Sequence, residues 1–462
     1  MKSRKKLKDN KIYFTMIVVI SLLLLLSSSA FAIYLVKTLG EKKLSFKLNL
    51  LVTPQEEEIL TIDPKLVEGM IPVVWDETES KWKVTTKDDP EWFNYDQKKW
   101  ANVMMPDGSN SAYSVGDTIS DNDLGSMFVW IPRYEYKINY YTDSTKTTIS
   151  DTQTYYGSID IQFIKINQIT PDDGYKIHPA FKDGYIDDGD DTNDFKNGEW
   201  DKEIAGFWFA KFETTDSLQI KPNTYNTSKI DISTMYNNSR NKTYGLPTNI
   251  ANQVNPHMMK NSEWGAMAYL SYSSYGINGE NIYVNNFFQA PKAVSGYYAT
   301  TYNAAQNNNI NTLNYYSTDN GQKGSSTWNI YGIYDIVGGR TEYTAGYLKD
   351  ISGDSQIIKD EGTKYCTAYD ISNNGNTEET IKNSSTPGDA IGETFFWNKN
   401  AVGLPNGNGG TPTANLLSAD RPCIARGGAM SNGAQGAGLM SFWTLVSGAS
   451  QYRTTREILI VE

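Results

Sequence analysis

Cysteine and histidine are scarce in this chain, whose 462 residues include two of each. A multi-histidine metal centre or a histidine-based catalytic triad therefore has little material from which to form. The two cysteines, Cys366 and Cys423, lack the CxxC spacing of a zinc site. In an exported protein they could form one disulfide, and two small buried side chains are the alternative.

Common catalytic motifs are also missing. No GxSxG elbow, HExxH helix or phosphate-binding P-loop occurs in the sequence. Acidic pairs such as Asp172 with Asp173, or Asp187 with Asp188, are too frequent in loops to indicate a glycosidase. The aspartate-rich stretch 183–199 does not have the EF-hand spacing, so we favour a solvated loop there over a calcium site.

Positive charge is concentrated at the N-terminus. The first 11 residues carry six positive charges and one negative charge, and residues 12–36 carry none. Because the whole chain has a net charge of −11, the remaining residues hold −16. Such an acidic surface argues against nucleic acid as a partner, since binding to phosphates depends on cationic contacts.

A long uncharged, mainly apolar run occurs at residues 12–36. As a helix it would be about 37 Å long, enough to cross a bilayer with its basic flank in the cytoplasm. We therefore expect a single-pass membrane protein with an extracellular C-terminal part. Ala30 and Ala32 also form a small-x-small cleavage site, so the alternative is a secreted protein cleaved after Ala32. Residues 1–36 are thus interpreted as a signal anchor or signal peptide, and residues 37–64 as a stalk.

The rest of the chain has the composition of a folded protein with many turns. Residues 65–120 alternate short apolar runs with Asp, Asn and Pro, which predicts a small β-rich module. The segments "FVWIPRYEY" and "GFWFAKFETT" are typical of strands. A helix is predicted from Asn261, as N-cap, to a stop near Gly276, and a weaker one near 231–240. Residues 278–327 are rich in Asn, Tyr, Ser and Gly, which predicts long surface loops.

Five motifs follow one another in a recognisable order. They are "FVWIPRYEY", "GFWFAKFETT", "MMKNSEWGAMAYL", "YGIYDIVGGRTEY" and "RGGAMSNGAQGAGLMSFW…YRTTREILI". This series resembles that of the formylglycine-generating enzyme (sulfatase-modifying factor) superfamily, whose fold is an elaborated C-type-lectin fold. The resemblance implies an α+β, C-type-lectin-like domain with long irregular loops over residues 125–462, preceded by the β-rich module and the N-terminal transmembrane helix.

The fourth motif has a metal-binding counterpart in that superfamily. In this chain, the resemblance implies a structural calcium ion (Ca²⁺) bound by the side chains of Asp335 and Glu342 and by the carbonyls of Gly338 and Arg340. Calcium prefers six to eight oxygen ligands, and glycines allow a loop to turn its carbonyls inward. The alternative is a glycine corner in which Asp335 caps the turn and Glu342 forms an ion pair. Two departures from the family pattern in this turn support that alternative.

The fifth motif argues against the enzymatic activity of the superfamily. The generating enzymes hold copper with two cysteines shortly after the R-G-G sequence, and soft thiolates suit Cu(I). Alignment on Arg426 places Asn432 and Ala437 at those two positions, while Cys423 precedes the motif. We therefore expect no copper and no oxidation of a substrate cysteine.

A non-catalytic branch of the superfamily is a better match. It includes retroelement-diversified variable proteins and related bacterial surface proteins, which display changeable side chains between the R-G-G sequence and the last strand. The resemblance implies ligand-binding positions at Met430, Ser431, Gln435, Trp443, Thr444, Gln451 and Arg453. Trp and Arg are common anchors of binding surfaces. For Trp443, burial within a strand pair is an equal alternative.

The sequence thus predicts an exported, membrane-anchored, adhesin-like protein of bacterial or prophage origin. We expect it to bind an unidentified protein or glycan on a lectin-like frame, without catalysis. One alternative is a divergent oxidoreductase of the formylglycine-generating type. The other is a structural component of a surface appendage or virion.

Overall fold

The computed structural model describes residues 63–109, 112–186, 194–195, 198–215, 218–225, 229–289, 292–301, 306–348, 364–369, 386–398, 422–429 and 437–462. Strands account for 30% and helices for 13%, so the fold is mostly β. The predicted α+β, C-type-lectin-like class is therefore wrong. Many of the strands have only two or three residues, too few for an alternating pattern to reveal them in sequence.

The largest sheet has eight antiparallel strands in the order β13-β24-β12-β5-β3-β1-β2-β4. Its strands are β1 (Ile71–Asp76), β2 (Lys81–Val84), β3 (Asn102–Met104), β4 (Thr118–Ile119), β5 (Met127–Pro132), β12 (Gly206–Ala210), β13 (Val254–Met258) and β24 (Glu457–Val461). Every residue of β5 and β12 is buried, as their apolar sequences require. These two strands confirm the predictions from "FVWIPRYEY" and "GFWFAKFETT".

The predicted β-rich module contributes four strands to this same sheet. Strand β3 pairs with β5, with Asn102 opposite Val129 and Met104 opposite Met127. The sheet therefore continues across the boundary that the sequence suggested between residues 120 and 125. Residues 65–120 share one sheet and one hydrophobic core with the region that follows them.

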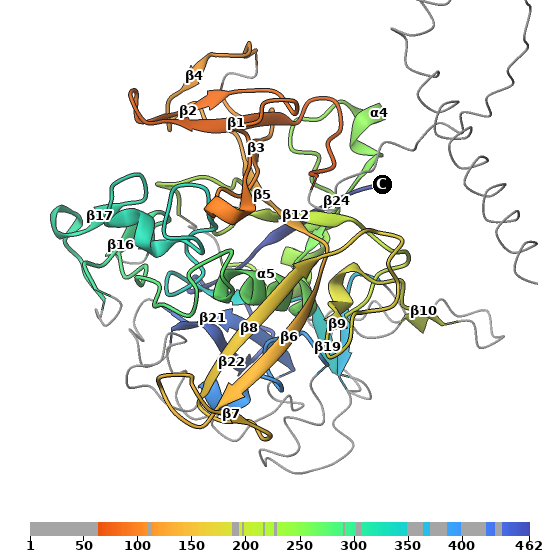
Figure 1. Cartoon of the computed structure of the whole chain (residues 1–462). Helices are drawn as coiled ribbons and strands as arrows, with labels where there is room; N and C mark the ends of the chain where they lie inside the picture. The colour runs from red at the N-terminus through yellow and green to blue at the C-terminus, as the bar shows by residue number, and fades with distance from the viewer. Residues whose placement is uncertain are drawn as a thin grey trace, which may run out of the picture. The chain divides into compact units, whose positions relative to one another are not determined.

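A second sheet forms a long hairpin beside the main helix. Its strands are β6 (Tyr134–Tyr141), β7 (Ile149–Ser150), β8 (Tyr156–Phe163) and β9 (Lys176–Ile177). Strand β6 pairs with all three others. Figure 1 shows β6 and β8 running past α5 (Asn261–Tyr272), and α5 contacts β8.

A third sheet has the order β22-β21-β18-β23. It contains β18 (Thr341–Tyr343), β21 (Cys423–Gly427), β22 (Gly438–Leu445) and β23 (Arg453–Thr455), and only the β18–β23 pairing is parallel. Helix α5 contacts both β5 of the large sheet and β22 of this one, so it lies between the two sheets (Figure 1). This position explains why all 12 residues of α5 are buried.

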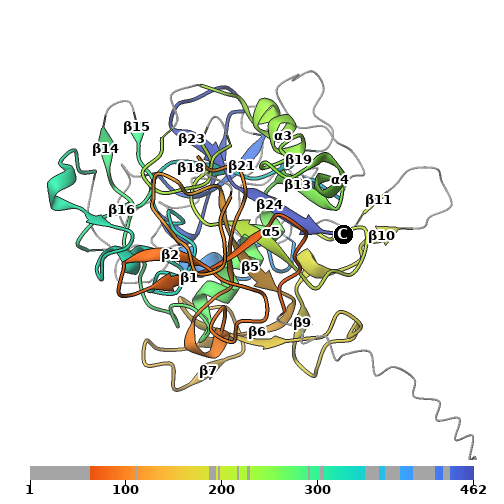
Figure 2. The same ribbon diagram turned by 90° about the horizontal axis from the view of Figure 1, so that it is seen from above.

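Shorter elements complete the described fold. Four two-stranded sheets pair β10 (Tyr185–Ile186) with β11 (Asp194–Phe195), β14 (Phe288–Gln289) with β15 (Lys292–Ala293), β16 (Tyr297–Tyr298) with β17 (Asn314–Tyr315), and β19 (Gly346–Leu348) with β20 (Thr367–Tyr369). The 3₁₀ turns are η1 (Tyr95–Gln97), η2 (Pro179–Phe181), η3 (Ile310–Thr312), η4 (Gly321–Gly324) and η5 (Phe395–Asn398). Figure 2 shows β14, β15 and β16 on the opposite side of the fold from β10 and β11.

Both predicted helices are confirmed. Helix α5 begins at Asn261, with Lys260 rather than Asn261 as its N-cap, and the Glu263 carboxylate accepts the Lys260 backbone N–H at 2.7 Å. It ends at Tyr272, one turn before the predicted stop. Helix α3 (Ile232–Arg240) is capped by Asp231, whose side chain accepts an N–H from its third residue. A one-turn helix, α4 (Thr248–Ala251), follows.

Most buried apolar side chains form one cluster that reaches from β1 to β24. A smaller cluster lies between α3 and the third sheet and contains both cysteines. Cys366 and Cys423 are buried there as thiols, so the structure agrees with the second of the two alternatives for this pair.

Several predicted features lie outside the described residues. These are the signal anchor or signal peptide at 1–36, nearly all of the stalk at 37–64, and part of the aspartate-rich stretch 183–199. Within the residues that the structure does describe, no helix is long and apolar enough to span a membrane. The transmembrane helix of the fold prediction therefore has no support from the structure.

Candidate functional site

The predicted calcium turn forms a buried corner just before β18. Gly338 and Gly339 both have positive φ angles, of 86° and 62°. A Cβ atom on Gly338 would lie 2.3 Å from the Asn285 carbonyl oxygen, and one on Gly339 would lie 2.1 Å from Oε1 of Glu213. Asp335 also adopts a left-handed conformation, with φ at 61°. At positions 338 and 339, glycine is therefore required both by the backbone angle and by the lack of space for a Cβ atom.

Asp335 is fully buried, and one of its oxygens is well bonded. Oδ1 accepts hydrogen bonds from the Tyr298 hydroxyl at 2.6 Å, from Asn285 Nδ2 at 2.8 Å and from the Gly296 N–H at 3.0 Å. Oδ2 has no hydrogen-bond partner among the described residues. An unsatisfied buried carboxylate oxygen is costly, so Oδ2 would favour an additional ligand.

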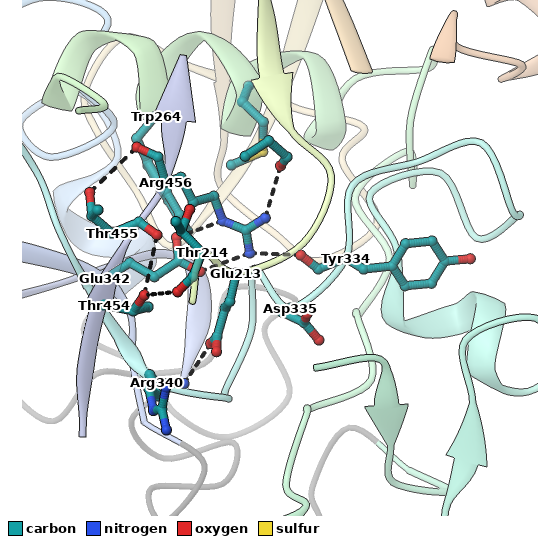
Figure 3. Close-up of polar contacts among 12 residues, drawn as sticks. Glu213, Thr214, Trp264, Tyr334, Asp335, Arg340, Glu342, Thr454, Thr455 and Arg456 are labelled. Carbon is teal, nitrogen blue, oxygen red and sulfur yellow. Dashed lines mark hydrogen bonds and ion pairs between the residues drawn. The ribbon is translucent and has the colours of Figure 1, made fainter. Parts of the chain in front are cut away.

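Glu342 forms a buried ion pair with Arg456. Arg456 donates through Nε to Oε2 at 2.7 Å and through Nη2 to Oε1 at 2.8 Å, and both side chains are fully buried (Figure 3). Arg456 also donates through Nη1 to the Ala210 carbonyl at 3.1 Å and through Nη2 to the Tyr334 carbonyl at 2.7 Å. Burial raises the pKa of Glu342 to about 7, although the guanidinium of Arg456 opposes this shift.

A third buried carboxylate, Glu213, faces the same corner. It accepts the Arg340 backbone N–H at 2.5 Å, as Figure 3 shows. Burial raises the pKa of Glu213 well above its usual value, and the charges of Asp335 and Glu342 raise it further. The charge of Arg340 and the hydrogen bond from its backbone N–H oppose this shift.

The structure thus groups the predicted metal residues but gives them other partners. Both oxygens of Glu342 are held by Arg456, so a cation would have to compete with a bidentate ion pair. Asp335 Oδ2 is suited to act as a calcium ligand, whereas the oxygens of Glu342 are not in this arrangement. No group of three His, Cys, Asp or Glu side chains in the described segments is arranged to hold a metal ion. The calcium site stays a prediction.

The predicted ligand positions have different environments. Met430, Ser431 and Gln435 lie outside the described residues, as does Asn432 of the copper alignment. On β22, Trp443 is half-buried and Thr444 is buried. Gln451 and Arg453 are half-buried.

Arg453 bonds within the chain rather than pointing freely into solvent. Its Nη1 donates to the carbonyls of Val446 at 2.7 Å and Gly448 at 3.2 Å, and it also contacts the Tyr343 hydroxyl. The Tyr343 hydroxyl donates to the same Val446 carbonyl at 2.6 Å. Arg453 and Tyr343 therefore fix the turn of residues 446–452, which joins β22 to β23.

This 446–452 turn exposes two large side chains that the sequence reasoning missed. Val446 is 48% exposed and Tyr452 is 47% exposed. The Tyr452 ring lies 6.3 Å from that of half-buried Phe288 on β14. Tyr452 lies between the predicted ligand-binding residues Gln451 and Arg453, and this position could have indicated it as a ligand-binding candidate. Glu213 and Arg456 were also missed, although both lie within the quoted motifs.

Comparison of the chain with protein-family models and with curated proteins finds no match. The resemblance to the formylglycine-generating enzyme superfamily therefore rests on its motifs alone and remains a prediction.

Proposed function

We propose that this chain is an exported, adhesin-like binding protein that presents the 446–452 turn to a protein or glycan ligand, without catalysis. The observation that carries the proposal is the fixing of this turn by hydrogen bonds to its backbone. Arg453 and Tyr343 together make three hydrogen bonds to the carbonyls of Val446 and Gly448. The side chains of Val446 and Tyr452, in the same turn, are exposed.

A fixed turn with exposed apolar side chains is well suited to binding. Ordering an interface loop costs free energy, and a loop that is already ordered avoids most of that cost. Tyrosine is a common anchor because its ring offers a large contact area with few rotatable bonds. Half-buried Trp443 on β22 is a further candidate contact, and Phe288 supports the Tyr452 ring.

Export is proposed from the N-terminal sequence and from charge. A basic segment followed by an uncharged apolar run at residues 12–36 is typical of export signals, and the remaining chain is acidic. We place the protein at the cell surface or in the medium. Protease treatment of intact cells tests this, because degradation of the chain is expected only if it lies outside the cytoplasm.

The binding proposal is tested by a screen of the full chain against surface proteins and an oligosaccharide panel. Tyr452→Ala should weaken the strongest interaction about tenfold, the size of a typical interface anchor. Arg453→Ala should weaken it mainly by loosening the turn, which amide hydrogen exchange at 446–452 would detect. Tyr155→Ala, at a tyrosine that is 40% exposed elsewhere, is the matched control.

The same screen separates the binding surface from the calcium prediction. If calcium supports the frame, a chelator should lower the melting temperature and Asp335→Ala should abolish that effect. Equal binding by wild type, Tyr452→Ala and Trp443→Ala would contradict the proposed surface, whatever the chelator does.

A further inference from the structure

The β16–β17 hairpin presents two tyrosine rings on one face. Tyr297 pairs directly with Tyr315, and Tyr298 pairs with Asn314. Tyr298 is fully buried and its hydroxyl bonds to Asp335, so its side of the hairpin faces the core. Since residues opposite each other share a face, Tyr297 and Tyr315 lie together on the other side. Both are half-buried, with ring centroids 5.1 Å apart.

The orientation of both rings is fixed at their hydroxyl ends. The Tyr315 hydroxyl donates to Oδ2 of Asp121 at 2.6 Å, and the Tyr297 hydroxyl donates to Oδ1 of Asn223 at 3.3 Å. The buried Phe287 ring packs against Tyr297, with the two ring centroids 5.2 Å apart. Fixed rings lose little conformational entropy when a ligand stacks on them.

The chemistry around the rings selects among the ligands that stack on aromatic groups. Nucleotides and sugars both do so, but the net charge of −16 on the chain after residue 36 disfavours phosphates. Asn223 is exposed and Asp121 is half-exposed, so their polar groups can exchange water for sugar hydroxyls. Tyrosine combines an apolar ring face with a polar tip, which matches the two kinds of surface on a pyranose.

We propose that Tyr297 and Tyr315 form a stacking subsite for a neutral oligosaccharide, with Asn223 and Asp121 as its polar rim. This subsite is formed by residues of β16 and β17 and not by those of the 446–452 turn, and it does not depend on the function proposed for that turn. Burial, and then the charge of Asp121, raise the pKa of Tyr297. Affinity for a neutral sugar should therefore stay constant from pH 6 to pH 9.

The test is isothermal titration calorimetry of the purified full chain with cellohexaose, chitohexaose and maltohexaose. At least one of these sugars should bind, and Tyr297→Ala should weaken that binding about tenfold or more, as removal of a stacking ring does. Tyr297→Phe, which keeps the ring, should remain within about threefold of wild type, and Tyr155→Ala should be unchanged. Circular dichroism and melting temperature confirm that each variant is folded.

Three outcomes would overturn the proposal. The first is that none of the three sugars binds. The second is that wild type and Tyr297→Ala bind sugar with equal affinity. The third is that Tyr297→Ala loses binding to a protein ligand while its sugar binding is unchanged. The last result would indicate a protein-binding face instead. Tyr452→Ala distinguishes the two surfaces, because it should lower binding at the 446–452 turn and leave sugar binding at Tyr297 intact.

Discussion

The buried carboxyl of Glu457 should make the stability of this protein fall as pH rises. Glu457 lies on β24, where its Oε1 accepts the Ser239 hydroxyl at 2.6 Å and its Oε2 has no partner among the described residues. Burial raises its pKa from about 4.5 to about 8, although the Ser239 hydrogen bond opposes this shift. The side chain is therefore neutral in the folded protein at pH 7.

The sign and size of the effect follow from these two pKa values. Between about pH 4.5 and pH 8 the folded state holds a proton that the unfolded state has released, so folding takes up a proton and the free energy of unfolding falls as pH rises. At ~1.4 kcal/mol per pKa unit, Glu457 should remove roughly 2 to 3 kcal/mol between pH 6 and pH 9. The loss levels off above pH 8, where both states are ionised.

Glu457→Gln isolates this contribution. Glutamine keeps an acceptor for Ser239 and cannot ionise, so the variant should lose less stability than wild type between pH 6 and pH 9. Urea unfolding followed by tryptophan fluorescence measures both proteins at each pH. The difference between them removes the parallel effects of other buried carboxyls, and the exposed Glu79→Gln is the control. An identical pH dependence in wild type and Glu457→Gln would refute the reasoning.

Three further predictions concern the core. Arg456→Met should lower the free energy of unfolding by about 3 to 5 kcal/mol, because Glu342 would stay buried without its cation; a loss below about 1 kcal/mol in urea unfolding would contradict a tight pair. Gly339→Ala should lower the melting temperature more than Gly116→Ala. Both glycines have positive φ, but a Cβ on Gly116 would meet nothing within 4 Å, whereas one on Gly339 would meet Glu213. Equal losses would argue against the close approach of Glu213 to Gly339. His178 should stay neutral down to about pH 5, because burial lowers its pKa to about 3; a protonated ring in ¹⁵N spectra at pH 5 would exclude this.

The features that the sequence predicted correctly depend on local patterns. Helix α5 and strand β12 have side-chain patterns and flanking residues that can be recognised within a dozen positions. Sheet membership depends instead on pairings between distant residues. Nothing near β3 indicates that it will pair with β5, and strands as short as β16 and β17 have too few residues to show a period. For this reason the sequence predicted a separate module where the structure has one continuous sheet, and it did not reveal the two-residue strands within residues 278–327.

The candidate site divides in the same way. The glycines of the turn after Asp335 indicated a tight corner, because their conformational freedom is a property of single residues. The partners of the buried carboxylates could not be found in this way, since Arg456 lies 114 residues from Glu342. The family resemblance implied a metal ion bound by Asp335 and Glu342, whereas in the structure Glu342 pairs with Arg456.

Strand β18 connects the buried ion pair to the proposed binding surface. Along this strand, the Thr341 N–H donates to the Tyr452 carbonyl at 3.2 Å, Glu342 holds the buried arginine, and the Tyr343 hydroxyl donates to the Val446 carbonyl at 2.6 Å. A buried ion pair stabilises a fold only modestly, but it is expensive to break, so it fixes the position of the strand that carries it. The two ends of the 446–452 turn are bonded to that strand. We therefore interpret the ionic core as the element that holds the turn in one conformation, which is the property on which a preformed binding surface depends.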